Sequence, residues 1–365
     1  MSPSPRPERL HSLDALRGAD LFWIVGGHSL VAALAAATGW QSLAWIEAQC
    51  HHVAWHGFRF YDLIFPLFLF LAGVSMPLSF SGRLKRGQNR ADLRAHALRR
   101  GTLLVFLGVV YNGALWADEG QARYASVLGR IGLGWLGAAL IVIHTSPRAQ
   151  WRWFWGLLIG YGLLLVGIPA PGMDEVSLAQ GETLVGWVDR TLLPGRLHRS
   201  TSDPEGLLST VPAVATALSG VFAGRWLTNR APGPALRLTG LVAAGLLALA
   251  AGKLLDPYLP INKNLWTSSF VLWCTGWSLL LLALFHALID LPPARRWYMP
   301  MVVFGANSIL IYLLHRFVDF QGLFQNSVSW ALPSDMPAWV VAAGGLAVEG
   351  VLLAFLYERQ AFLRV

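Results

Sequence analysis

The sequence predicts an all-α protein, a polytopic bundle of about ten transmembrane helices with both termini in the cytoplasm. The chain of 365 residues is 55% hydrophobic and 13% charged, a balance that a soluble globule does not have. Apolar segments of about 20 residues recur along it, which is the length a helix needs to cross a bilayer core of roughly 30 Å. Many of its 17 tryptophans lie at the ends of these segments, as in the aromatic belts of membrane proteins.

We expect the spans to form a single transmembrane domain over residues 1–365. The first apolar run is long for a cleaved signal peptide, and further spans follow it directly, so we interpret it as a membrane helix. The expected spans are Ala19–Ala37, Phe60–Leu78, Gly101–Trp116, Ser126–His144, Trp153–Ile168, Leu207–Leu227, Leu238–Leu255, Trp266–Leu288, Pro300–Phe317 and Ala338–Tyr357.

The basic residues indicate the orientation. With a cytoplasmic N-terminus, the inner segments hold most of the arginines and lysines, including the cluster from Gly82 to Arg100, and the outer loops hold few. This cluster either only marks the cytoplasmic side of the membrane, or it binds phosphate groups at the cytoplasmic end of the helix bundle. The loop around His52 and the segment 170–206 then lie outside.

Composition also argues against two kinds of partner. The basic residues behind the net charge of +8 are distributed as the predicted topology requires, and they do not alternate with aromatic residues as in soluble nucleic-acid-binding motifs. We therefore exclude nucleic acid as a partner. The two cysteines, Cys50 and Cys274, have no partner at zinc-type spacing, so we expect no metal.

The stretch from Gln49 to Leu78 contains the strongest candidates for chemistry. Asp62 lies just inside an apolar run, where an ionisable group is costly unless it faces protein or water. His52 precedes it by ten residues. Histidine, with an ordinary pKa of about 6.5, can take a proton from a nucleophile and return it to a leaving group, and a carboxylate can fix its tautomer. Alternatively, the histidines and Trp55 only anchor an interfacial loop.

Polar residues inside the spans have two interpretations. His28 lies in the first span, and Asn307 and Ser308 form a polar pair inside the ninth. They either contact a substrate or form the helix-to-helix hydrogen bonds that are common in membrane proteins.

Two cations lie at or near the outer face. Arg130 begins the fourth span, and Lys263 lies among asparagines. Each suits an anionic group or a paired acid such as Asp203 or Glu205, and a loop salt bridge is the alternative.

Six blocks of the chain, in order and over nearly its whole length, resemble the heparan-α-glucosaminide N-acetyltransferase family of transmembrane acetyltransferases. Six ordered blocks are more specific than any single motif. The chain lacks the extra N-terminal luminal portion of the lysosomal enzyme, so we expect a bacterial member in the inner membrane. The blocks are SLDALRG from Ser12, HHVAWHGFRFYDLIFPLFLFLAGVS from His51, YASVLGRIGLGW from Tyr124, SDPEGLLST from Ser202, INKNLWTSSFVLW from Ile261 and FGANSILIYLLH from Phe304.

The resemblance implies acetyl transfer from cytoplasmic acetyl-CoA to the amino group of a terminal glucosamine at the periplasmic side. It assigns the catalytic histidine to His52 in the segment HVAWHG, where Val53 replaces the family's alanine. Asp62 matches the family's acid. His28 stands where the lysosomal enzyme has an asparagine near the thioester. Further positions that match the family are Arg130, Asn262, Lys263 and Asn264.

We therefore expect His52, with Asp62, to act as a base or to carry the acetyl group. His28 or Asn264 could stabilise the oxyanion. Acetyl-CoA is the expected co-substrate, and the expected partners are an amino sugar, membrane lipid and, as for some family members, a second copy of the chain. The residues expected at acetyl-CoA are His28, Arg130, Asn307 and Ser308, and those expected at the sugar are Trp55, Asp203, Glu205, Asn262, Lys263 and Asn264.

Two other functions compete with this one. A secondary transporter for sugars or amino sugars would need no acetyl-CoA and would have discontinuous helices around a midplane site. An envelope O-acetyltransferase would keep the histidine and accept hydroxyl nucleophiles. The sequence leaves open the acceptor, the choice between a ternary complex and an acetyl-histidine, and the inner residues that would hold the phosphates of coenzyme A.

Overall fold

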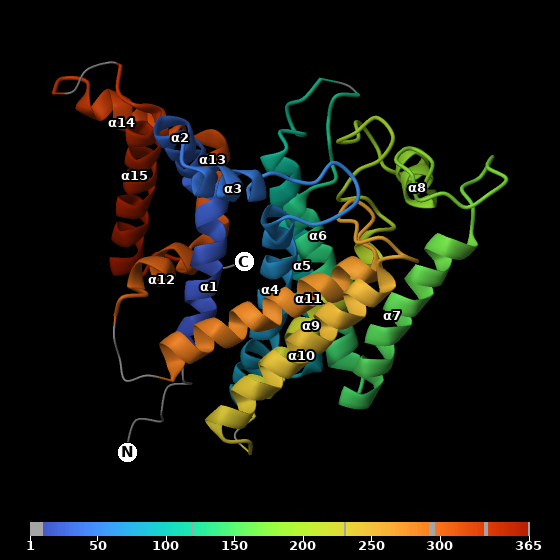
Figure 1. Cartoon of the computed structure of the whole chain (residues 1–365). Coiled ribbons are helices and arrows are strands. Elements are labelled where there is room, and N and C mark those ends of the chain that lie inside the picture. The colour runs from blue at the N-terminus through green and yellow to red at the C-terminus, as the bar shows by residue number, and fades with distance from the viewer. Residues whose placement is uncertain (1–9, 119, 230, 292–295, 332–334, 364–365) are drawn as a thin grey trace, which may run out of the picture. The chain divides into compact units, whose positions relative to one another are not determined.

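The computed structural model describes residues 10–118, 120–229, 231–291, 296–331 and 335–363, and these residues form helices joined by loops (Figure 1). The described part of the chain contains no strand beyond isolated bridges. The all-α prediction is therefore confirmed for these residues. The terminal segments, on which the predicted cytoplasmic placement of both termini depends, lie outside them.

The chain divides into two compact units. Unit 1 contains Met1–His52, Arg59–Ile64 and Leu281–Arg364, and unit 2 contains Val53–Phe58, Phe65–Leu280 and Val365. Each unit has its own buried core. The single domain over residues 1–365 stays a prediction.

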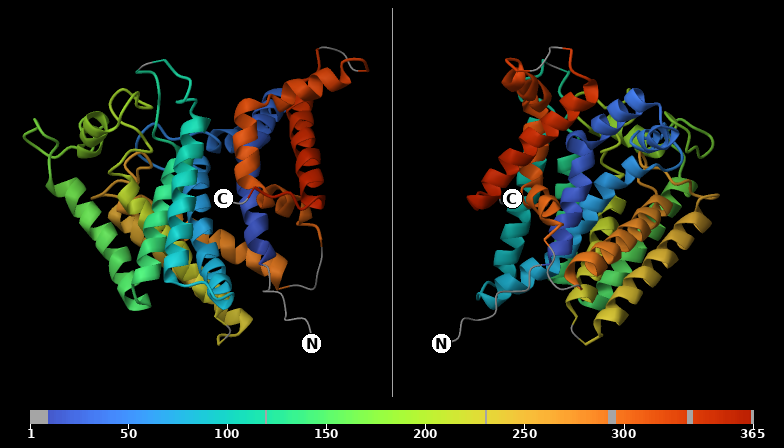
Figure 2. Two further views of the ribbon diagram at one scale, coloured as in Figure 1. Left: turned by 180° about the vertical axis from the view of Figure 1, so that it is seen from behind. Right: turned by 60° about the vertical axis from the view of Figure 1, so that its left-hand side comes forward.

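Unit 1 is built around the first membrane helix. Its helices are α1 (His11–Phe22), the π-helical turn η1 (Trp23–Gly27), α2 (His28–Thr38), α3 (Gln41–Gln49), the second π-helical turn η2 (His286–Asp290), α12 (Met299–Ala306), α13 (Ser308–Phe317), α14 (Phe320–Val328) and α15 (Ala338–Glu358). Helix α1 packs against α12, and α15 packs against α14 and α2, as the views in Figures 1 and 2 show.

Unit 2 is a helical bundle with an extended loop region. Its helices are α5 (Arg90–Tyr111), α6 (Val127–His144), α7 (Pro147–Gly167), the short α8 (Leu184–Leu192), α9 (Thr210–Thr228) and α10 (Pro234–Leu255). Helices α4 (Phe60–Lys85) and α11 (Ser268–Phe285) run from one unit into the other. Within unit 2, α6 packs against both α5 and α9.

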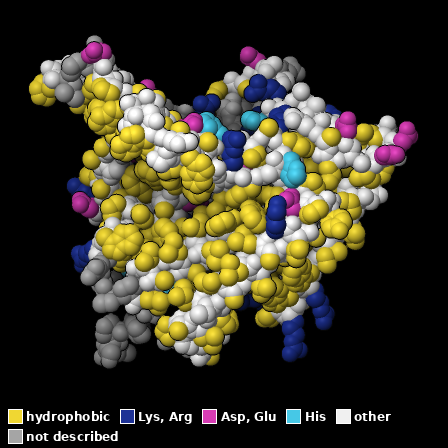
Figure 3. Space-filling model, viewed as in Figure 1, with side chains coloured by type: hydrophobic (Ala, Val, Ile, Leu, Met, Phe, Trp, Pro, Cys, Tyr) yellow, Lys and Arg dark blue, Asp and Glu magenta, His cyan; other side chains and the backbone are white. Residues whose placement is uncertain are grey.

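The described residues contain six helices that are long and apolar enough to cross a membrane, or seven if the bent pair α12 and α13 counts as one. Hydrophobic side chains cover much of the exposed surface of α7 and α10 (Figure 3), including Leu163 on α7 and Leu247 and Leu254 on α10. Such a surface is typical of helices that face lipid. The structure is thus that of a multi-pass helical membrane protein, and the count of about ten spans stays a prediction.

The predicted span Pro300–Phe317 is not a single straight helix. Helix α12 ends at Ala306, α13 begins at Ser308, and the two are bent by 72°. The break occurs at Asn307, whose backbone is not helical (φ −120°, ψ 33°). Its side chain binds the backbone of the C-terminal segment instead, donating to the carbonyl of Ala361 and accepting from the amide of Leu363.

Glycines set the helix spacing in both units. In unit 1, a Cβ atom at Gly18 would overlap the Met301 carbonyl oxygen. In unit 2, a Cβ at Gly220 of α9 would overlap the carbonyl oxygen of Phe70 in α4. Small residues of this kind let membrane helices approach backbone to backbone, where van der Waals contact replaces the hydrophobic effect as the source of association.

Gly220→Ala tests this packing. The added methyl group should force α4 and α9 apart and destabilise the protein by about 1–3 kcal/mol, the usual cost of overpacking. The measurement is the melting temperature of the purified protein in detergent. Gly160→Ala on α7 is the matched control, because a Cβ there meets nothing within 4 Å. Equal melting temperatures for the two variants would contradict the packing argument.

Candidate active site

His52 and Asp62 form a hydrogen-bonded pair in unit 1. The Nδ1 atom of His52 lies 2.8 Å from Oδ1 of Asp62. The Asp62 side chain is 1% exposed and the His52 side chain is 49% exposed. Because an ionised carboxylate only accepts hydrogen bonds, the His52 proton lies on Nδ1, and Nε2 keeps its lone pair. The partnership of these two residues, which the sequence suggested, is present in the fold.

The start of α4 fixes the position of Asp62. Its Oδ2 atom accepts a hydrogen bond from the backbone amide of Arg59 at 3.1 Å, as the acid of a capping box does at the third position of a helix. The next amide, that of Phe60, donates to the side-chain oxygen of Gln49 at 3.3 Å. The Asp62 carboxylate therefore satisfies a helix end with one oxygen and the imidazole with the other, and the helix dipole favours its negative charge.

Tyr61 connects His52 with His28. Its ring centroid lies 4.9 Å from that of His52 and 6.0 Å from that of His28. His28 begins α2, where its Nδ1 donates to the Trp23 carbonyl at 3.0 Å and its Nε2 accepts from the Ser29 hydroxyl at 3.1 Å. Unit 1 thus places His28 one aromatic ring away from the His52–Asp62 pair. Sequence reasoning missed Tyr61, because only its place beside Asp62 distinguishes it from other aromatic residues.

Asn307 and Ser308, also in unit 1, lie at the break between α12 and α13. Both polar groups of the Asn307 amide bind backbone atoms of the C-terminal segment, at 2.9 Å and 3.0 Å. These contacts join Asn307 to a segment beyond the end of α15, so the predicted helix-to-helix hydrogen bonds of the pair stay a prediction. A role toward acetyl-CoA stays a prediction.

The acids Asp203 and Glu205, predicted at the sugar, belong to an ion-pair cluster in unit 2. Arg123 binds Asp203 through two nitrogens, Nε to Oδ2 at 2.8 Å and Nη2 to Oδ1 at 2.6 Å, and also binds Glu205. Burial alone would raise the pKa of Asp203, but the hydrogen bonds and charge of Arg123 outweigh it and hold the pKa below its ordinary value. The sequence offered the salt bridge as an alternative but did not single out Arg123 as the partner.

A third acid, Asp189 of α8, supports this cluster. It is fully buried and accepts hydrogen bonds from the backbone amides of Asp203 and Leu207 at 3.2 Å and 3.0 Å. Burial raises the pKa of Asp189 to about 6, although these amides oppose the shift. Sequence reasoning missed Asp189, since nothing near it marks a buried acid. The carboxylates of this region therefore hold the loop 198–207 in place.

Arg130 is a buried cation with unused donors. It is 1% exposed, and its Nη2 atom donates to the Ser209 hydroxyl at 2.5 Å and to the Gly206 carbonyl at 3.2 Å. Its guanidinium carbon lies 5.0 Å from the centroid of the Trp266 ring, a cation–π contact. Within the described part of the chain, Nε and Nη1 have no hydrogen-bond partner. These two donors suit a carbonyl or an anionic group.

The remaining predicted sugar residues also belong to unit 2. Asn262 is 1% exposed, and its side-chain oxygen accepts from the Leu265 amide at 3.1 Å. Asn264 is 8% exposed, and Lys263 lies between the two. The indole of Trp55 donates to the Leu178 carbonyl at 2.9 Å, which ties this loop to the segment 170–206.

The predicted residues thus fall into two sets. One set lies in unit 1 and contains the catalytic candidates, and the other lies in unit 2 and contains most of the substrate candidates. No group of three or more His, Cys, Asp or Glu side chains that could hold a metal ion occurs among the residues with described positions.

Comparison with known proteins confirms the family resemblance. A family model described as "Domain of unknown function (DUF5009)" matches residues 9–119. The heparan-alpha-glucosaminide N-acetyltransferase of Mus musculus is 26% identical over an alignment of 375 residues, which covers 86% of this chain and 56% of that protein. The Homo sapiens protein of the same name is 27% identical over 430 residues, covering 99% and 61%. The chain therefore spans less than two thirds of the length of these relatives.

Arg123→Gln tests the ion-pair cluster. It leaves a buried carboxylate without its cation, so we expect a loss of about 3 kcal/mol of stability near neutral pH. The stability that Arg123 contributes is fully present above the pKa that Asp203 has in the unfolded chain. It is lost as the pH falls through the pKa of Asp203 in the folded protein, which is lower. Melting temperatures measured in detergent at about pH 7 and about pH 2.5 should therefore differ less at the acidic end.

The matched control for this variant is Arg196→Gln, which removes an exposed arginine from the same loop region. It should melt like the wild type at both pH values. A gap between Arg123→Gln and the wild type that does not shrink in acid would contradict the ion-pair account.

Proposed function

We propose that the protein is a membrane-bound acetyltransferase that moves an acetyl group from acetyl-CoA to the amino group of a glucosamine-type sugar. The observation that carries the proposal is the His52–Asp62 pair, in which a buried carboxylate orients a half-exposed imidazole. The similarity to the two N-acetyltransferases supports the reaction class. Neither observation depends on the other.

His52 would act as the general base. As the amine attacks the thioester carbonyl, the new C–N bond forms and nitrogen must lose a proton, which Nε2 of His52 accepts. The C–S bond then breaks, and the imidazolium returns the proton to the departing thiolate. The Asp62 carboxylate stabilises the imidazolium in between. The alternative route, in which Nε2 itself takes the acetyl group before the amine arrives, uses the same pair and the same tautomer.

The proposed reaction also needs donors for its intermediate, and the candidates are His28 in unit 1 and Arg130 in unit 2. A tetrahedral intermediate carries negative charge on oxygen, and preorganised donors stabilise it. In the tautomer that its contacts indicate, His28 accepts at Nε2 and donates at Nδ1 to the chain itself, so it would have to rotate to serve as an oxyanion donor. The free Nε and Nη1 donors of Arg130 support its predicted role toward acetyl-CoA.

We place His52 at the periplasmic side of a bacterial inner membrane, with both termini cytoplasmic. The distribution of arginines and lysines supports this orientation. The charged nucleotide end of coenzyme A would then remain at the arginine-rich cytoplasmic end of the helix bundle, while its long pantetheine arm reaches through the bundle.

The loss of activity in His52→Ala tests the proposal. We expect wild-type protein in detergent to transfer label from acetyl-CoA to glucosamine, and the variant to be slower by about 100-fold or more, because it lacks the base. His51→Ala is the matched control. It removes the neighbouring histidine, whose side chain is 62% exposed and pairs with Glu47, and it should retain activity. Failure of the wild type to acetylate any amine or hydroxyl acceptor would favour the transporter instead.

Asp62→Asn tests the role of the carboxylate. The amide can donate to Nδ1 and would then leave the proton on Nε2, so we expect kcat to fall by about 100-fold or more while KM changes little. Asp256→Asn serves as the control, because Asp256 contacts His56 in a similar pair (3.2 Å) outside the proposed chemistry. Equal rates for the two variants would rule out Asp62 as the orienting acid.

A further inference from the structure

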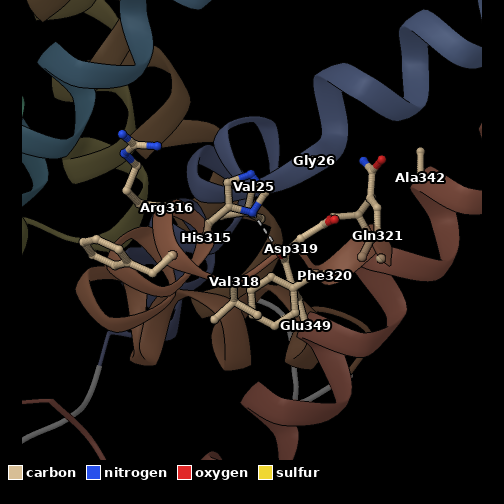
Figure 4. Close-up of a pocket in the computed structure, with 13 residues that line it drawn as sticks. Val25, Gly26, His315, Arg316, Val318, Asp319, Phe320, Gln321, Ala342 and Glu349 are labelled. Atoms are coloured by element: carbon tan, nitrogen blue, oxygen red, sulfur yellow. Dashed lines mark hydrogen bonds and ion pairs between the residues drawn. The ribbon is translucent and has the colours of Figure 1, made fainter. Parts of the chain in front are cut away.

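Unit 1 contains a pocket whose wall includes none of the residues proposed for acetyl transfer. It has a volume of about 390 Å³ and lies beside the break in the first membrane helix. Its wall includes Gly26 of η1, His315 of α13, Phe320 of α14 and Glu349 of α15 (Figure 4). Pockets for small molecules begin at about 300 Å³, so this one can hold a compact ligand.

The backbone around the pocket is built to leave it open. Gly26 has φ 152° and ψ −11°, which interrupts the helix between Trp23 and Gly27. A Cβ at Gly26 would meet the Leu346 side chain at 3.0 Å, so this position favours glycine for its space as well as for its φ. Opposite, α13 ends at Phe317 and α14 begins at Phe320, capped by Asp319.

Glu349 is the unusual group in the pocket. It is 1% exposed, and its Oε1 atom lies 2.7 Å from Nδ1 of His315. Its other oxygen, Oε2, is buried and has no hydrogen-bond partner in the described part of the chain. A buried carboxylate oxygen without a donor is costly, more so inside a membrane bundle. The pocket therefore lacks a hydrogen-bond donor at this point.

Two further groups of the pocket, on His315 and Asp319, are acceptors. Because Nδ1 of His315 donates to Glu349, its Nε2 keeps a lone pair. Asp319 adds a second negative charge. Arg316 also lines the pocket and brings a positive charge, and its side chain extends away from Glu349 (Figure 4). Phe320 is parallel to the His315 ring, with centroids 6.4 Å apart and an angle of 9°, and forms an aromatic wall. Acceptors, negative charge and an aromatic ring together favour an organic cation.

We propose that this pocket binds a small primary amine in its ammonium form. Ammonium has three N–H donors, which would satisfy Oε2 of Glu349 and Nε2 of His315 while its positive charge lies near Phe320. A free amine and the headgroup of an aminolipid share this chemistry. His52 is not among the residues that line the pocket, and the proposal holds whether or not the protein transfers acetyl groups.

Calorimetric titration of the full-length protein in detergent tests the proposal, with ethanolamine as the probe and N-acetylethanolamine as its neutral analogue. We expect the wild type to bind ethanolamine and not the analogue. Glu349→Gln should weaken binding by about tenfold or more, because it removes the negative charge. Glu358→Gln makes the same change at an exposed site on the same helix and should bind like the wild type. His52→Ala should do so too.

A second variant separates loss of binding from loss of folding. Ala342→Leu adds bulk to the pocket wall, which includes Ala342, and keeps both polar residues, so it should also lose ethanolamine while its melting temperature stays close to that of the wild type. Equal affinities for Glu349→Gln and Glu358→Gln, or loss of binding in His52→Ala alone, would overturn the proposal.

Native mass spectrometry identifies the source of the amine. Protein is released from vesicles of phosphatidylethanolamine or of phosphatidylglycerol. Retention of phosphatidylethanolamine by the wild type and not by Glu349→Gln would assign the pocket to a lipid headgroup. Ethanolamine binding without lipid retention would assign it to a free amine. Binding of neither ethanolamine nor phosphatidylethanolamine would overturn the proposal.

Discussion

The buried carboxylate of Asp62 is the constraint on which the candidate site depends. An acid in an apolar bundle must find donors, and Asp62 finds one in the backbone amide of Arg59, just before α4, and another in the imidazole of His52. The same solution recurs in unit 1, where Asp290 pairs with His286 at 2.9 Å and Glu349 with His315 at 2.7 Å.

The exposed fraction of the imidazole distinguishes the three pairs. It is 49% for His52 and 36% for His315, but only 5% for His286. Only the first two can therefore meet a ligand without rearrangement, and Asp290 instead holds the start of α1 through the amide of Ser12.

Breaks in two predicted spans position the groups around these pairs. The π-helical turn η1 exposes the Trp23 carbonyl to His28, which places that histidine beside Tyr61, and its Gly26 forms part of the amine pocket. The break at Asn307 lets α13 turn away from α12. Broken membrane helices are tolerated only where other groups satisfy the freed backbone. At the first break the His28 ring binds the Trp23 carbonyl. At the second, the Asn307 side chain binds the backbone of the C-terminal segment.

The sequence was sufficient for the helical membrane fold and for the pairing of His52 with Asp62, because hydropathy and the depth of an acid in an apolar run are local signals. It was not sufficient where partners are far apart in the chain. Arg123 meets Asp203 across 80 residues, and Asn307 meets the C-terminal segment across more than 50. Glu349 is different. It lies inside the predicted span Ala338–Tyr357, and the rule that selected Asp62 would have selected it as well.

The tautomer of His52 tests the central claim most directly. Nitrogen-15 NMR of protein labelled at histidine, at a mildly alkaline pH where imidazoles are neutral, distinguishes a protonated ring nitrogen from an unprotonated one. The spectrum of His52→Asn assigns the signals. The account predicts that Nδ1 of His52 carries the proton and that Nε2 is unprotonated, as the contact with Asp62 requires. A proton on Nε2 in the wild-type protein would contradict it, because His52 could then act neither as the base nor as the acetyl carrier.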